Sequence, residues 1–175
     1  MPGSGATAEA VAMLLIRPAT PADIGAVDAL LGRSYGPLLR ADYPPSTLIL
    51  ALPRMTRAQP QLLASGRYFV AEDGRQPLGA GGWSPEPPGG GPVVPGLGHV
   101  RHVATDARAA RRGVGRAVME RVMAEARGAG ALRLSALSTL TAVPFYAALG
   151  FRSLRPVLLR FGGADFPAVE MERDL

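Results

Sequence analysis

The chain has 175 residues, of which 47% are hydrophobic, enough for one domain with a buried core and too many for a disordered polypeptide. It has no cysteine, which excludes disulfides, thiolate metal sites and a cysteine nucleophile; two histidines, His99 and His102, make no convincing zinc site, so we expect no metal. The formal charge is +5 with arginine in place of lysine throughout, and a basic surface concentrates polyanionic ligands such as nucleic acid or a nucleotide cofactor.

The N-terminal region carries no targeting signal that we recognise. "AVAMLLI", residues 10 to 16, is short and has no basic region before it, so we predict no signal peptide. No apolar run approaches the roughly 20 residues that span a membrane. Together with the missing cysteines, this predicts a cytoplasmic protein that has a flexible tail at residues 1–12 and one domain at 13–175.

The first elements of the domain are a predicted strand and then helices. "MLLIRPAT", residues 13 to 20, predicts a strand, and a helix follows from about Pro21, with Thr20 as its N-cap. "STLILAL" and "TRAQPQLLAS" predict one or two short helices.

A hairpin and a central strand come next. "RYFVAEDGRQPLGAGGWS" combines a β-rich run, an Asp73-Gly74 turn signal and a second strand. A proline- and glycine-rich connector, residues 85–96, leads to "LGHVRHVAT", a predicted strand at 97–105. Strict alternation would place residues 99, 101, 103 and 105 on one face and 100, 102 and 104 on the other.

Two glycines then stand where a helix should begin, in "ARAARRGVGRAVMERVMAEARGAG". Glycine costs roughly 1 kcal/mol relative to alanine inside a helix, so Gly113 and Gly115 need another use. The first amides of a helix have no partner and carry the positive end of its dipole, and a bare glycine turn lets an anion approach them. Arg111, Arg112 and Arg116 add donors. The pattern predicts a phosphate or pyrophosphate site.

The remaining segments predict a strand ("ALRLSAL"), a short helix ("AVPFYAAL"), a strand from Phe151 and a last strand near "AVEMERD". The order β-α-β-β-β-α-β-α-β-β, without an internal repeat, predicts a mixed α/β domain. The glycine turn is no P-loop, because the chain has no lysine, and no dinucleotide-binding loop, because Val118 stands where the third glycine should be.

The strand, the glycine turn, the amphipathic helix and "STLTAVPFYAALGFR" together resemble the GNAT superfamily of acyl-CoA-dependent N-acyltransferases. At the start of this helix, that family has a motif that begins with Gln or Arg. Any two residues follow, then Gly, any one residue, and finally Gly or Ala. Gly113 and Gly115 match, whereas Ala110 holds the leading position and Ala107 the place of a frequent proline.

A second family signature is an aromatic residue, three residues and then Gly-Phe. It is matched by Phe145, Tyr146, Gly150 and Phe151, with Thr139 in place of the usual upstream asparagine.

The resemblance implies a single GNAT-like α/β domain with a twisted, mostly antiparallel sheet of about six or seven strands and about four helices, splayed at a cofactor cleft. It also implies acetyl-CoA as co-substrate, with its pantetheine arm on the strand that ends at Thr105 and its pyrophosphate at the glycine turn. The cofactor-binding residues so implied are Val103, Ala104, Thr105, Ala110, Arg111, Arg112, Gly113, Val114, Gly115, Arg116 and Thr139.

The resemblance also assigns catalytic roles. A phenol is protonated at neutral pH, so Tyr146 can donate a proton to a thiolate leaving group; the alternative is an aromatic core residue. The central strand has no carboxylate, which leaves His102, as a proton relay, or Glu72 as candidates for the base. His102 could equally be packed or surface-exposed, and Glu72 a solvated turn residue. Aromatic residues suit concave sites, so Tyr35, Tyr43 and Trp83 are candidates for an acceptor pocket.

The sequence therefore favours an acetyl-CoA-dependent N-acetyltransferase that acts by direct attack in a ternary complex on a small-molecule or peptide amine. A non-catalytic acyl-CoA-binding sensor or interaction module of the same fold is the alternative. A nucleic-acid binder ranks third, since no recognition motif accompanies the arginines, and we expect no nucleic-acid or membrane partner. A homodimer is compatible with the resemblance, and the acceptor amine is not encoded in any motif.

Overall fold

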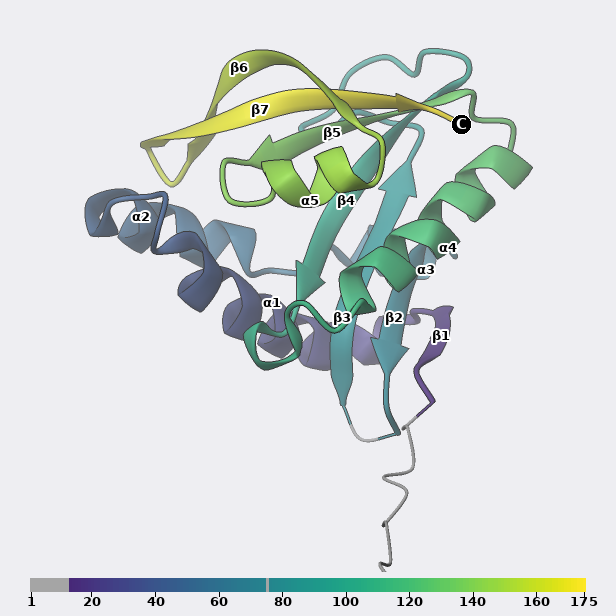
Figure 1. The fold of residues 1–175 in the computed structure, drawn as a ribbon, viewed down its shortest axis with the longest axis horizontal. Helices are drawn as coiled ribbons and strands as arrows, with labels where there is room; N and C mark the ends of the chain where they lie inside the picture. The colour runs from purple at the N-terminus through teal and green to yellow at the C-terminus, as the bar shows by residue number, and fades with distance from the viewer. Residues whose placement is uncertain (1–12, 75) are drawn as a thin grey trace, which may run out of the picture.

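The computed structural model describes residues 13–74 and 76–175, so the tail expected at residues 1–12 lies outside the described chain. Strands and helices follow one another in the expected order, and the ribbon in Figure 1 shows them as one layered domain. The strands are β1 (Leu15–Pro18), β2 (Tyr68–Glu72), β3 (Pro77–Ser84), β4 (Leu97–Thr105), β5 (Arg133–Thr139), β6 (Arg152–Phe161) and β7 (Ala164–Asp174). The helices are α1 (Ile24–Leu39), α2 (Pro45–Met55), α3 (Pro60–Ala64), α4 (Val114–Gly128) and α5 (Val143–Ala148), with 3₁₀ turns η1 (Pro21–Asp23) and η2 (Ala107–Ala109).

The seven strands form one sheet in the order β1-β2-β3-β4-β5-β7-β6. All neighbours are antiparallel except β4 and β5, which run parallel. The β4–β5 ladder joins residues 97–99 to 133–135 and then stops, although both strands continue. The sheet therefore opens between β4 and β5, as the sequence predicted. Figure 1 shows β5, β6 and β7 turned away from β2, β3 and β4.

Helices cover both faces of the sheet. Phe69 on β2 packs in a cluster with Val118 and Met119 of α4, whereas its neighbour Tyr68 packs in a second cluster with Leu30 of α1. Successive side chains of a strand point to opposite faces, so a sheet covered on both faces reads as an unbroken apolar run. "YFVAE" is such a run.

The glycine-rich strand β3 lets α4 lie close to the sheet. A Cβ on Gly79 would lie 2.6 Å from Cγ1 of Val114, and one on Gly81 would lie 3.1 Å from Cγ1 of Val118. Side chains at these two positions would push the helix outward. Gly79 and Gly81 therefore set how closely the first turns of α4 pack on β3.

A β-bulge at His102 interrupts the strict alternation expected for β4. Ala80 pairs with Ala104 but Gly82 pairs with Arg101, and His102 has a φ of 45°. Val100 and Val103 consequently pack in the cluster of α4, while Ala104 packs in the cluster of α1. The alternation expected across residues 99–105 is wrong beyond Arg101, because a bulge places one extra residue in the strand.

Candidate functional site

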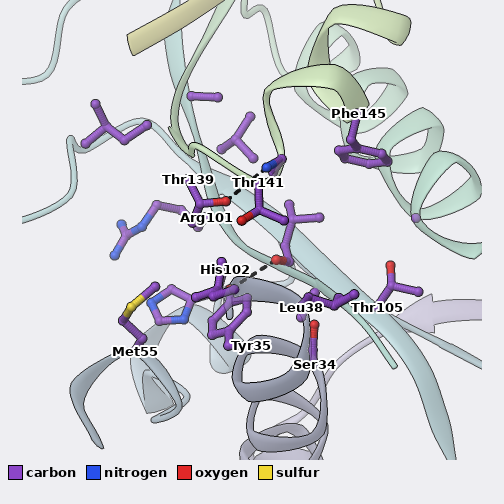
Figure 2. A pocket seen from close by; sticks show the side chains of 18 of the residues that line it. Ser34, Tyr35, Leu38, Met55, Arg101, His102, Thr105, Thr139, Thr141 and Phe145 are labelled. Atoms are coloured by element: carbon purple, nitrogen blue, oxygen red, sulfur yellow. Dashed lines mark hydrogen bonds between the residues drawn. The ribbon is translucent and has the colours of Figure 1, made fainter. Parts of the chain in front are cut away.

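One cavity of about 930 Å³ opens where β4 and β5 separate. Its walls come from α1, the end of α2 and the segment after it, β4, β5, α5 and the first turn of α4. In the close view of Figure 2, Arg101, His102 and Met55 lie at one side of the cavity and Thr105 and Phe145 at the other. We call the side of Thr105 and the α4 turn the cofactor end, and the side of Arg101 and Met55 the acceptor end.

The cofactor end contains backbone N–H groups without acceptors. The first donor of α4 is the N–H of Ala117, which bonds to the carbonyl of Gly113 at 3.0 Å. The amides of residues 113–116 have no hydrogen-bond acceptor among the residues that the structure describes. Unpaired amides at the positive end of a helix dipole form an anion site. This geometry suits a phosphate or pyrophosphate.

Gly113 and Gly115 serve different purposes. Gly113 is the N-cap of α4 with φ +80°, and a Cβ there would meet nothing within 4 Å, so the space above the amides is open. A Cβ on Gly115 would lie 3.0 Å from both the Phe145 ring and Oγ1 of Thr105. Gly113 therefore supplies the turn conformation and access for a ligand, whereas Gly115 lets α4 pack against β4 and α5.

Both non-glycine residues with positive φ, within the described part of the chain, line this cavity. They are His102 at 45° and Arg111 at 67°. Backbone held in the left-handed region costs free energy and persists where the surrounding structure imposes it, often at functional sites. The strain therefore marks the β4 bulge and the α4 turn as parts of one site.

Arginine side chains frame the same turn. Arg111 and Arg116 line the cavity, but Arg112 does not, and its backbone N–H bonds to the carbonyl of Ala109 at 3.3 Å. The assignment of Arg112 to the cofactor site is therefore not supported by its position. Other residues assigned to the cofactor from the sequence line the cavity: Val103, Ala104, Thr105, Ala110, Val114 and Thr139.

Thr139 stands at the end of β5, where the family pattern has asparagine. Its Oγ1 accepts a hydrogen bond from the N–H of Ala142 at 3.1 Å, which Figure 2 shows as a dashed line. The hydroxyl oxygen thus caps the turn that leads into α5. Thr139 supports the position of α5 while its side chain faces the cavity.

Two tyrosines hold the bulge of β4 in place. Tyr35 of α1 donates its hydroxyl proton to the carbonyl of Val103 at 3.0 Å, and Tyr68 of β2 donates to the carbonyl of His102 at 2.7 Å. Burial raises the pKa of both phenols, so both remain protonated donors at neutral pH. Tyr35 lines the cavity as expected, but its hydroxyl is engaged by the protein.

Tyr146 of α5 differs from these two tyrosines because its hydroxyl has no hydrogen-bond partner among the described residues. Its ring is 7% exposed and contacts Phe145 and Phe151 edge to face, with centroids 5.2 and 5.3 Å apart. Burial, with a smaller contribution from Tyr35, raises the pKa of Tyr146. The ring is a core residue, while the protonated hydroxyl remains available to a ligand in the cavity.

His102 lines the cavity at the acceptor end, beside Met55 in Figure 2. Burial, assisted by the charge of Arg101, lowers its pKa to about 4, so the imidazole is neutral at physiological pH. Nε2 lies 3.5 Å from Nε2 of Gln59, and Nδ1 is buried without a hydrogen-bond partner. The ring can therefore accept a proton, as a weak base.

Three residues assigned from the sequence lie elsewhere, which contradicts their assignments. Glu72 forms an ion pair with Arg17 at 3.1 Å on the β1–β2 side of the sheet and does not line the cavity, so it is no candidate for the base. Trp83 is 4% exposed and packs in the α4-side core. Tyr43 is 3% exposed, and its hydroxyl bonds to the carbonyl of Pro167 and the N–H of Leu140.

Several cavity residues carried no signal in the sequence. Arg57 and Gln59 belong to a segment whose pattern predicts only a short helix, Arg54 falls outside the predicted elements, and Arg101 has a predicted place only in the alternation of β4. They line one cavity because the segment between α2 and α3 reaches β4, where Gln59 accepts a hydrogen bond from Arg101 and lies 3.5 Å from His102. No spacing along the chain encodes that contact.

Within residues 13–74 and 76–175, no group of three His, Cys, Asp or Glu side chains is arranged to hold a metal ion. None of the helices in this part of the chain has both the length and the apolar character needed to cross a membrane.

The family of the protein follows from its sequence. The model of the acetyltransferase (GNAT) domain matches residues 64–153, which include β2 to β5, the α4 turn and α5. This match covers more than half of the chain, so the protein belongs to the GNAT acetyltransferases. No curated protein sequence matches it significantly.

Solved structures share the fold over nearly the whole chain. A GCN5-related N-acetyltransferase from Rhodopseudomonas palustris superposes with a TM-score of 0.78 at 20% identity, covering 92% of this chain and 95% of its own. The ribosomal-protein-S18-alanine N-acetyltransferase from Escherichia coli gives 0.64 at 17% identity, covering 93% and 94%. PaiA N-acetyltransferase from Thermoplasma acidophilum, solved with coenzyme A, gives 0.69 at 11% identity, covering 93% and 99%. The expected GNAT-like α/β fold is confirmed.

Proposed function

We propose that this protein is an acetyl-CoA-dependent N-acetyltransferase that transfers an acetyl group to a primary amine by direct attack in a ternary complex. The observation that carries the proposal is that one cavity holds both the unpaired amides of the α4 turn and the free hydroxyl of Tyr146. The coenzyme A complex of the Thermoplasma acidophilum PaiA structure supports the choice of co-substrate.

The cofactor end offers groups for each part of coenzyme A. The amides of residues 113–116, together with the guanidinium groups of Arg111 and Arg116, would hold the pyrophosphate. Val103 and Thr105 lie where the β4–β5 ladder has ended, so their strand edge is free to pair with the amides of the pantetheine arm. Acetyl-CoA supplies the acetyl group as a thioester.

Tyr146 would complete the transfer at the sulfur. As the acceptor nitrogen forms its bond to the carbonyl carbon, the carbon–sulfur bond breaks and its electron pair leaves with the sulfur. The Tyr146 hydroxyl donates its proton there, since no protein group engages it. Burial raises the pKa of the Tyr146 phenol, so the hydroxyl is protonated before the transfer, and the phenolate left behind regains a proton from solvent, equal in number to the one that the amine releases.

His102 is the candidate that remains for the proton of the amine. Its imidazole is neutral and lines the acceptor end, so it can take a proton directly or through water. The bulge that carries it also turns the backbone at residues 102 and 103, whose carbonyls are held by Tyr68 and Tyr35 on the α1 side. A backbone N–H of this fixed bulge is suited to polarise the thioester carbonyl.

The test is an acetyl-CoA consumption assay over a broad panel of primary amines, with the acetylated product identified by mass spectrometry. We expect at least one class of amine to be acetylated at a rate that saturates with both substrates. The protein would instead be an acyl-CoA-binding module if it binds coenzyme A tightly while acetyl-CoA consumption, corrected for spontaneous hydrolysis of the thioester, stays at background for every amine of the panel.

A further inference from the structure

The acceptor end of the cavity is cationic and contains no acid. The cavity is lined by five arginines, of which Arg111 and Arg116 belong to the cofactor end. The other three, Arg54, Arg57 and Arg101, belong to the acceptor end and come from α2, the segment after it and β4. No aspartate or glutamate is among the described residues that line it. The charge of this end is therefore not neutralised within the cavity.

These three arginines also lack ion pairs elsewhere. No carboxylate of the described residues lies within ion-pair distance of Arg54, Arg57 or Arg101, whereas eight other arginines of the described chain form such pairs. Glu86 acts on Arg101 only through its longer-range charge. Asp42 does not line the cavity, but it accepts a hydrogen bond at 2.7 Å from the hydroxyl of Thr141, which does.

Arg101 is held in position with donors to spare. Nη1 donates to Oγ of Ser84 at 2.9 Å and Nη2 donates to Oε1 of Gln59 at 2.8 Å. A guanidinium has five N–H groups in a planar fork, so these two bonds fix its plane and leave other N–H groups free. Fixed, partly buried N–H groups with a full positive charge are suited to a carboxylate or phosphate.

Beside the arginines, Gln59 and His102, this end carries apolar side chains. Leu38 and Met55 contribute from α1 and α2, and Leu159, Phe161 and Phe166 from β6 and β7. A ligand here would bury apolar groups against these side chains and place a negative charge at the arginines. A polycationic amine would meet like charge, and no described acid lines the cavity to pair with it.

We propose that the acceptor is a primary amine that also carries an anionic group, carboxylate or phosphate, which Arg101 binds with the help of Arg54 and Arg57. This inference rests on the proposed transferase function and specifies its substrate class. Amino acids, peptides with a nearby C-terminal carboxylate and phosphorylated amines belong to the class. Polyamines and lysine-rich protein segments are excluded from it.

The experiment compares acceptors with and without the anionic group, with kcat/KM calculated for the neutral amine, because replacing a carboxylate by a carboxamide lowers the pKa of a neighbouring amine. Phenylalanine, leucine and a series of ω-amino acids of increasing length are assayed beside their carboxamides, O-phosphoethanolamine beside ethanolamine, and spermidine alone. We expect kcat/KM to be at least tenfold higher for the charged member of the best pair. The carboxylate and phosphate pairs show which anion is used. Equal or better use of carboxamides or spermidine would overturn the inference while leaving the transferase function intact.

Variants assign the effect to the arginines. Arg101→Gln should lower the ratio of kcat/KM for the charged acceptor to kcat/KM for the uncharged one at least tenfold, mainly by raising KM for the charged acceptor. Arg101→Lys should restore part of this ratio. If Arg101→Gln does not fold, Arg57→Gln at an exposed position repeats the test. The control is Arg127→Gln, which removes the same charge from the last turn of α4. A loss of coenzyme A affinity in Arg101→Gln would instead place this arginine in the cofactor site and overturn the inference.

Binding separates the two proposals. Calorimetry of the coenzyme A complex with the same carboxylate and carboxamide pairs needs no turnover. Carboxylate binding that depends on Arg101 without any acetylation would support the anion site and contradict the transferase. If no charged acceptor is bound and none is acetylated, both proposals are contradicted.

Discussion

The two ends of the cavity are both rich in arginine, yet they are built differently. At the cofactor end the groups that face a ligand are backbone amides of residues 113–116, whose directions are fixed by helix geometry. At the acceptor end they are side chains from α2, the segment after it and β4. A site made of backbone depends on a local turn and tolerates changes of side chain. A site made of side chains depends on each side chain, so single substitutions should affect the two ends differently.

The largest effect is expected at Tyr146, which lines the same cavity. Tyr146→Phe keeps the ring and its contacts with Phe145 and Phe151 but removes the proton, so kcat should fall by roughly 10²- to 10⁴-fold with little change in coenzyme A affinity. The measurement is single-turnover acetyl transfer at saturating acetyl-CoA.

Tyr35→Phe is the matched control for that experiment. The Tyr35 hydroxyl donates to the carbonyl of Val103, so its removal should lower the free energy of unfolding by about 1 to 2 kcal/mol and reduce kcat far less than Tyr146→Phe. A Tyr146→Phe protein that keeps more than about half of the wild-type chemical rate would remove Tyr146 from the role of acid.

The cofactor end should be most sensitive at Gly113. Gly113→Val places a branched side chain in the open space beside the unpaired amides, so coenzyme A affinity should fall by at least about 100-fold, as expected when two charge-assisted hydrogen bonds are lost. Calorimetry measures the affinity.

Gly130→Val controls for backbone strain in that comparison. Gly130 has φ +94°, also has nothing within 4 Å of a built Cβ, and lies just beyond the other end of α4. It should lose similar stability but keep its affinity. If both variants bind coenzyme A as wild type does, the amides of the α4 turn are not the phosphate site.

A smaller effect is expected from the titration of His102. Its pKa is about 4 in the folded protein against an ordinary value of 6.5, so between these values the unfolded chain binds a proton that the folded chain does not. Stability should therefore decline as pH falls from 6.5 to 4, with a contribution of up to about 1.4 kcal/mol per pH unit from this residue.

His102→Asn tests this contribution and suits the positive φ of the position, because asparagine tolerates left-handed backbone. Urea denaturation at several pH values should show a shallower decline in the variant than in wild type. Parallel curves across that interval would mean that His102 titrates normally and is not held neutral by burial.

The same contrast explains what the sequence could predict. The order of strands and helices follows from local patterns, and the break between β4 and β5 follows from the family resemblance. The bulge at His102 does not, because it depends on how β4 pairs with β3 and on hydroxyls from Tyr35 and Tyr68, far away in the chain. Strict alternation was therefore wrong at residues that line the cavity.

Single aromatic residues were the least predictable part of the site. Tyr35, Tyr43 and Trp83 have the same character in the sequence, yet only Tyr35 lines the cavity. Trp83 is buried against Gly98 of the neighbouring strand, and Tyr43 stacks on Phe166 with centroids 4.2 Å apart. Whether an aromatic side chain faces a core or a cavity is decided by the elements packed around it.

Amide hydrogen exchange resolved by NMR, with and without coenzyme A, tests the central claim most directly, because it reports on the N–H groups themselves. In the free protein the amides of residues 113–116 should exchange fast, since no described group accepts them, while that of Ala117 should be protected by the carbonyl of Gly113. Saturating coenzyme A should slow exchange at residues 113–116 strongly and leave Ala117 nearly unchanged. Tight binding of coenzyme A without added protection at these four amides would contradict the account.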